Sequence, residues 1–80
     1  MNQMSEISIH LEEIESLIKL CNTLDEEYEK SEIGLLAYFT GMNDYFKKMK
    51  ETVEKIYDLG GNDEVIEEVA AKFLENEEIE

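Results

Sequence analysis

Apolar side chains recur along most of this chain at alternating steps of four and three residues. In the first half the repeat consists of Ile7, Leu11, Ile14, Ile18 and Cys21. In the second half it consists of Leu35, Phe39, Met42, Phe46, Met49, Val53 and Ile56. This spacing places the apolar residues on one face of an α-helix and is typical of helices that pack side by side. The chain contains no proline to interrupt either repeat, so the pattern predicts two long, adjoining helices.

The register of the first repeat continues through Asp25 to Tyr28, so the two repeats span residues 7–28 and 35–56 and are equally long. The connection between them, from Glu29 to Gly34, is short. Equal helices joined by a short loop form an antiparallel hairpin. We expect the helices to cover residues ~4–29 and ~31–59, with Ser31 as the N-cap of the second. Gly41 lies inside the second helix, where glycine costs about 1 kcal/mol. It marks either a kink or a place where another backbone comes close, and the sequence leaves both open.

A third, shorter helix is expected at residues ~62–75, followed by a frayed tail at 76–80. Gly60 and Gly61 can close the second helix, because glycine adopts the left-handed conformation found at helix C-termini. Asn62 is a suitable N-cap for the third helix. The apolar stripe of that helix consists of Val65, Ile66, Val69, Ala70, Phe73 and Leu74.

The predicted fold class is therefore all-α: an antiparallel helical hairpin plus a shorter third helix, forming a three-helix bundle. Additional apolar residues widen both stripes of the hairpin beyond a two-helix seam. They are Leu17, Leu24, Leu36, Tyr38, Tyr45 and Tyr57. Either the third helix or a second copy of the hairpin could pack there, so a homodimer is one of the expectations.

With 80 residues the chain forms a single domain at most. Cys21 is the only cysteine, which rules out an internal disulfide and favours a reducing, cytoplasmic location. The N-terminal residues 1–6 contain no basic run followed by an apolar stretch, so we expect no signal peptide. No apolar run approaches the ~20 residues needed to span a bilayer, and no membrane association is expected.

Charge excludes several kinds of partner. The chain has 21 acidic residues against 7 lysines and no arginine, which gives a net charge of −14. Residues 1–34 and 60–80 each carry −7, whereas residues 35–59 contain four acids and four lysines and are neutral. Such a field repels nucleic acid and anionic membranes and attracts basic proteins. The lysines at 47, 48, 50 and 55 interleave with acids, which favours a solvated, internally paired face.

The usual arrangements of catalytic and metal-binding residues are not recognisable. His10 and Cys21 are eleven residues apart, or about 16 Å along one helix, too far for a nucleophile–base pair. A calcium loop starting at Asp58 would need glycine at its sixth position and glutamate at its twelfth, where Asp63 and Val69 stand. No glycine-rich phosphate loop is present. We therefore predict no catalytic residues, no cofactor and no metal site.

Acidic residues on the outer faces of the first and third helices are the candidates for partner binding, together with one outward leucine that could serve as an apolar anchor. The predicted partner-binding residues are Glu12, Glu13, Leu20, Glu26, Glu27, Asp63, Glu64, Glu67 and Glu68. Solubility alone is a sufficient reason for such a surface. The more specific interpretation is an anionic ladder that imitates a phosphate backbone and occupies a basic nucleic-acid channel.

The sequence thus favours a non-enzymatic inhibitor or regulator that docks on a basic protein surface, such as that of a nucleic-acid-processing complex. In its small size and acidity the chain resembles the inhibitors that phages use against host DNA-defence enzymes, including DNA mimics and anti-CRISPR proteins. The resemblance is compositional, so no residue role is carried over from it. Two alternatives remain: an assembly module that associates through apolar helix faces, and an acidic antitoxin or immunity protein.

Overall fold

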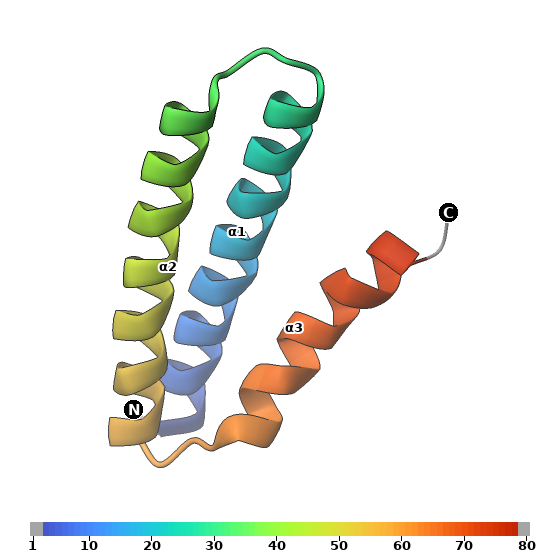
Figure 1. Ribbon diagram of the computed structural model, residues 1–80. Helices are drawn as coiled ribbons and strands as arrows, with labels where there is room; N and C mark the ends of the chain where they lie inside the picture. The colour runs from blue at the N-terminus through green and yellow to red at the C-terminus, as the bar shows by residue number, and fades with distance from the viewer. Residues whose placement is uncertain (1–2, 79–80) are drawn as a thin grey trace.

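The computed structural model describes the backbone of residues 3–78 and the side chains of residues 5–71. It contains the helices α1 (Gln3–Glu29), α2 (Leu35–Asp58) and α3 (Asp63–Glu78). No strand occurs among the described residues, so the predicted all-α class is confirmed. Helices α1 and α2 lie side by side as an antiparallel hairpin (Figure 1). The shorter α3 starts at the base of the hairpin beside α1 and runs away from it at an angle.

The main apolar cluster lies toward the end of the hairpin where α1 begins and α2 ends, and Leu17 and Cys21 are also buried farther along α1. Ile7, Ile14 and Ile56 form the buried part of this cluster, and Ile56 is completely inaccessible. Partly buried residues of all three helices pack against this cluster: Leu11, Ile18, Val53, Leu59, Val65, Ile66 and Val69. Helix α3 contributes to this cluster through its first turns, and its backbone then runs away from the hairpin.

The prediction that every residue of the α2 repeat packs in the hairpin seam is wrong. Leu35, Phe39 and Phe46 are 50, 57 and 54 % exposed. Thr52 is buried in α2, although it does not belong to the apolar repeat. Its hydroxyl donates to the Lys48 carbonyl oxygen at 2.9 Å.

The face of α2 that packs on α1 is rotated around the helix from the predicted apolar stripe, and small residues explain this rotation. A Cβ atom placed on Gly41 would lie 2.7 Å from Leu24 Cδ2, so the glycine admits a side chain of α1. Gly41 and Thr52 each stand one position before a residue of the predicted stripe, which is about 100° around the helix. Helix α2 is continuous across Gly41, so the glycine marks a close approach and no break.

The turn between α1 and α2 differs from the prediction. Ser31 was expected to cap α2, but α2 begins at Leu35 with Gly34 as its N-cap residue. Ser31 instead has a φ of 61°. Its N–H donates to the Tyr28 carbonyl, and the Glu32 N–H donates to the Glu27 carbonyl. This is the Schellman pattern that ends a helix, with a serine at the position glycine usually occupies.

The joint between α2 and α3 follows the prediction closely. Gly60 has a φ of 94°, and the Gly61 N–H donates to the Ile56 carbonyl at 2.9 Å, which closes α2. The Asn62 side-chain oxygen accepts the Val65 N–H at 3.3 Å and caps α3. Helix α3 continues to Glu78 instead of ending near residue 75. Two parts of the prediction lie outside the described residues: the apolar contacts of residues 73 and 74, and the end of the frayed tail at 79–80.

Candidate protein-binding surfaces

The acids predicted on the third helix share one exposed face. Asp63, Glu64, Glu67 and Glu68 are all exposed on the side of α3 that points away from the core-facing Val65, Ile66 and Val69. One hydrogen bond reaches this face from α2, where the Tyr57 hydroxyl donates to the Asp63 carboxylate. That bond raises the pKa of the Tyr57 hydroxyl.

One of the predicted acids on α1 adjoins this face, and a second lies farther along the same flank of the helix. Leu11 and Ile18 point toward the core that α3 helps to form. Glu12 and Glu26 are turned from them by about 100° and 80° around the helix, onto the flank of α1 away from α2, and both are exposed. Helix α3 lies on the same side of α1 (Figure 1). We call this surface the acidic face; it consists of Glu12, Asp63, Glu64, Glu67 and Glu68. Glu26 lies on the same flank of α1 but near the turn, at the end of the hairpin away from the start of α3.

The remaining predicted residues lie elsewhere. Glu13 and Leu20 follow the core-facing Leu11 and Ile18 by two positions, which turns them by about 200° around the helix. Glu27 is nine positions after Ile18 and is turned from it by about 180°. They therefore point away from α3, and Leu20 is 45 % exposed. The structure thus divides the predicted set between two opposite sides of the hairpin.

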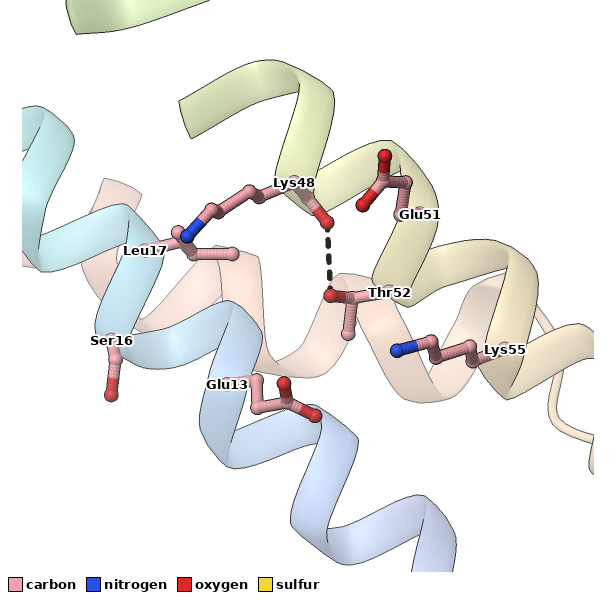
Figure 2. Close-up of a pocket in the computed structure, with 7 residues that line it drawn as sticks. All are labelled: Glu13, Ser16, Leu17, Lys48, Glu51, Thr52 and Lys55. Atoms are coloured by element: carbon pink, nitrogen blue, oxygen red, sulfur yellow. Dashed lines mark hydrogen bonds between the residues drawn. The ribbon is translucent and has the colours of Figure 1, made fainter. Parts of the chain in front are cut away.

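On the side opposite α3 a groove of about 400 Å³ runs between α1 and α2. Figure 2 shows its lining, with the Lys48 side chain extending toward α1. Both charge signs are present among the lining residues: Glu13, Ser16, Leu17, Lys48, Glu51, Thr52 and Lys55. Glu13 also lies 2.5 Å from His10 Nδ1. Glu13 therefore belongs to a groove of mixed charge and not to the acidic face.

The expected pairing of the α2 lysines is not found. Within residues 5–71, basic and acidic side chains lie within 4.0 Å of each other in the pairs His10–Glu13 and Lys19–Glu15. All four lysines of α2 are exposed, and two of them, Lys48 and Lys55, line the groove. Their charge nevertheless keeps α2 neutral, so the acidic face and α2 present different potentials.

Helix α2 carries an exposed apolar surface that differs from the predicted one. The sequence predicted Leu36 beside the seam, but it placed Leu35, Phe39 and Phe46 within the seam. The exposed surface consists of Leu35, Leu36, Phe39 and Phe46, which are 50, 82, 57 and 54 % exposed, and we call it the α2 apolar face. The Phe39 ring contacts Tyr38 at a centroid distance of 5.6 Å, and Tyr38 stacks on Tyr28 at 4.9 Å. The small residues Gly41 and Thr52 are the signal that could have located the true seam and left this face outward.

The two candidate nucleophilic or metal-binding side chains are separate in the structure. Cys21 is buried, and burial, followed by the charge of Asp25, raises the pKa of its thiol. His10 contacts Glu13 on a different part of α1. Among the described residues, no group of three or more His, Cys, Asp or Glu side chains is placed to hold a metal ion.

Comparison with known proteins adds no identification: no family model, curated protein or solved structure matches the chain. Within the described residues, none of the helices has both the length and the apolar content that crossing a membrane requires. Function is therefore inferred from the chemistry of the surfaces.

Proposed function

We propose that this protein is a non-enzymatic binding protein that docks its acidic face on a basic protein surface. The observation that carries the proposal is the segregation of charge. The acidic face gathers carboxylates from two helices, whereas the lysines of residues 35–59 lie on α2. Scattered acids would serve solubility equally well, but acids gathered on one face present a concentrated potential to a cationic partner.

Helix α3 bears an energetic cost for this arrangement. Asp63 and Glu67 are four residues apart, as are Glu64 and Glu68. Like charges at this spacing lie about 5–6 Å apart at their β-carbons and destabilise a helix by a few tenths of a kcal/mol per pair. A cationic partner surface would remove this repulsion, so binding and helix stability would be coupled.

The partner that fits this chemistry is a protein with a lysine- and arginine-rich groove, such as the nucleic-acid channel of a cytoplasmic enzyme complex. An acidic helical protein in that channel would exclude the nucleic acid by charge and by volume. The phage-type inhibitor, whether a DNA mimic or an anti-CRISPR protein, is the more specific form of this hypothesis and rests on size and composition.

The test is affinity capture from a host lysate by the tagged chain, with the variant Glu64→Lys/Glu67→Lys/Glu68→Lys beside it. Each change adds +2, so the net charge moves from −14 to −8. All three side chains are exposed, so we expect helicity to be retained in circular dichroism while the captured partner is lost. Capture should also fall between about 0.1 M and about 1 M salt, where the screening length shrinks from about 10 Å to about 3 Å.

A matched control separates the acidic face from charge in general. The variant Lys47→Glu/Lys48→Glu/Lys50→Glu moves the net charge from −14 to −20 on α2 and leaves the acidic face intact. It should capture the partner at least as well as the wild-type chain. Partner binding that survives about 1 M salt, or that both triple variants lose equally, contradicts the proposal.

A further inference from the structure

The α2 apolar face is an ordered surface and not a set of scattered side chains. Phe39 is held by the Tyr38 ring, which stacks on Tyr28 of α1. The Tyr38 hydroxyl also donates to the Asp25 carboxylate. These contacts hold the Tyr38 ring, against which Phe39 lies, so less conformational entropy is lost when the Phe39 ring is covered.

The covering of this face stops where α3 leaves the hairpin. Val53 and Ile56 belong to the same stripe of α2 and pack in the core with residues of α3. About two to five turns before Val53, Phe46, Phe39 and Leu35 are each half or more exposed. Contiguous exposed apolar surface of this kind marks interaction sites in soluble proteins.

We propose that two copies of this chain associate through their α2 apolar faces as an antiparallel dimer. Two phenylalanines and two leucines, at their observed exposure, present roughly 400–450 Å² of apolar surface per chain. Two chains that covered this surface completely would remove about 850 Å² of apolar surface from water. With the usual apolar share of about 57–65 %, such an interface measures up to roughly 1,300–1,500 Å². This lies within the 1,200–2,000 Å² range of stable protein–protein interfaces.

Charge favours a second copy at this face over any other contact between copies. Each chain carries −14, but residues 35–59, which form α2 and its end, are neutral. Contact through α1 or α3 would bring together surfaces that each carry a net negative charge, whereas contact through α2 would not. Helix α2 is thus the one helix on which two such acidic molecules can meet without direct repulsion.

The charges at the two ends of the α2 apolar face determine the orientation. Lys50 lies beyond Phe46 at one end, and Glu32 lies beyond Leu35 at the other, and both charged side chains are exposed. A two-fold axis between Phe39 and Met42 places Leu35 of one copy against Phe46 of the other. It also places each Lys50 beside the turn that carries Glu32 in the other copy. A parallel arrangement would oppose like charges, so the closed, isologous dimer is antiparallel.

Sedimentation velocity of the wild-type chain between about 1 and about 100 µM tests the proposal, since interfaces of this area give micromolar or tighter association. We expect a shift from one to two chain masses over this range. Phe39→Glu should weaken the dimer at least about 100-fold, because each dimer then contains two buried carboxylates at its centre. Phe39 is 57 % exposed in the single chain, so its replacement should leave the fold intact.

Ile9→Glu is the matched control, because Ile9 is also 57 % exposed but lies on α1. It adds the same charge and should leave the dimer unchanged. A wild-type chain that stays monomeric at about 100 µM overturns the proposal, and so does equal weakening by both variants.

A charge exchange tests the antiparallel orientation. Lys50→Glu and Glu32→Lys should each weaken the dimer a few-fold, as exposed ion pairs do, and the double variant should restore it at the original net charge. Additive weakening in the double variant overturns the orientation. Salt separates this proposal from docking by the acidic face, because the dimer should persist or tighten at high salt while the docked complex dissociates.

Discussion

The two ends of the hairpin use the same apolar repeat in different ways. Where α1 begins and α2 ends, Ile56 is fully buried beneath all three helices. At the end near the turn, Leu35 belongs to the same stripe of α2 and is 50 % exposed. The difference arises from the position of α3, which packs through Val65, Ile66 and Val69 and then runs away from the hairpin. A repeat shows which residues share a face, but the neighbouring helix decides how much of that face is covered.

This contrast divides the molecule into a part that holds the fold and a part available for binding. A chain of 80 residues has a free energy of unfolding of only about 4–12 kcal/mol at the usual 0.05–0.15 kcal/mol per residue. The buried cluster of Ile7, Ile14 and Ile56 lies entirely at the covered end. Substitutions there should affect folding, whereas substitutions at the open end should affect association.

The largest expected effect is that of Ile56→Ala. Removing a fully buried isoleucine should lower the free energy of unfolding by about 2–5 kcal/mol, because it deletes apolar contacts and leaves a cavity. Its counterpart Leu35→Ala, at the half-exposed end of the same stripe, should stay within about 0.5 kcal/mol of wild type. Urea denaturation of dilute chain, where dimerisation adds no stability, measures both. Similar losses at the two positions would mean that both ends are equally packed.

The sequence was sufficient to predict the helices and their order, because periodicity, the absence of proline and the signals at Gly60 and Asn62 all agree. It was insufficient for the seam of α2. The apolar pattern gave no weight to Gly41 and Thr52, although their small size lets α1 approach. The turn at Ser31 was also missed, since a left-handed serine has no reliable sequence signal.

The binding surfaces could be predicted only in part, because they too depend on how the helices pack against one another. The predicted acids are exposed, as their helix positions indicate, except that Glu27 is partly buried. Which residues surround each acid depends on the side of α1 against which α3 packs. Glu12 and Glu13 are adjacent in sequence, yet one adjoins the acidic face and the other lines the groove with Lys48 and Lys55. The exposure of Phe39 likewise depended on how far α3 reaches, which a chain's own periodicity does not contain.

The next largest effect concerns the joints at the two ends. A Cβ atom at Gly61 would lie 2.4 Å from Cγ2 of the buried Ile56 and 3.1 Å from its carbonyl oxygen. Because neither atom can move freely, Gly61→Ala should cost about 1–3 kcal/mol of folding free energy. Gly34→Ala at the open end meets no atom within 4 Å at an extended backbone position and should be nearly neutral. Thermal denaturation compares the two, and equal melting temperatures would show that the joint at the covered end is not tightly packed.

The smallest effect is a change in how stability depends on pH in the alkaline range, and it involves one tyrosine–aspartate hydrogen bond at each end. Tyr38 donates to Asp25 across the open end, and Tyr57 donates to Asp63 at the start of α3. In both cases the hydrogen bond to the carboxylate is the main cause that raises the pKa of the tyrosine above its usual value. Below pH about 10 the folded and unfolded tyrosines are both neutral, and the contribution of the bonds is fully present.

As the pH rises past that value, the unfolded tyrosines ionise first, so stability is lost until the raised pKa values of the folded chain are passed. The double variant Tyr38→Phe/Tyr57→Phe should therefore lose less stability above pH about 10 than the wild type does. Urea denaturation at neutral and alkaline pH measures this difference in slope. The single variants separate the two ends: Tyr38→Phe should also weaken the dimer, because it releases the Phe39 ring, whereas Tyr57→Phe should not. Parallel slopes for wild type and double variant would mean that neither bond persists in solution.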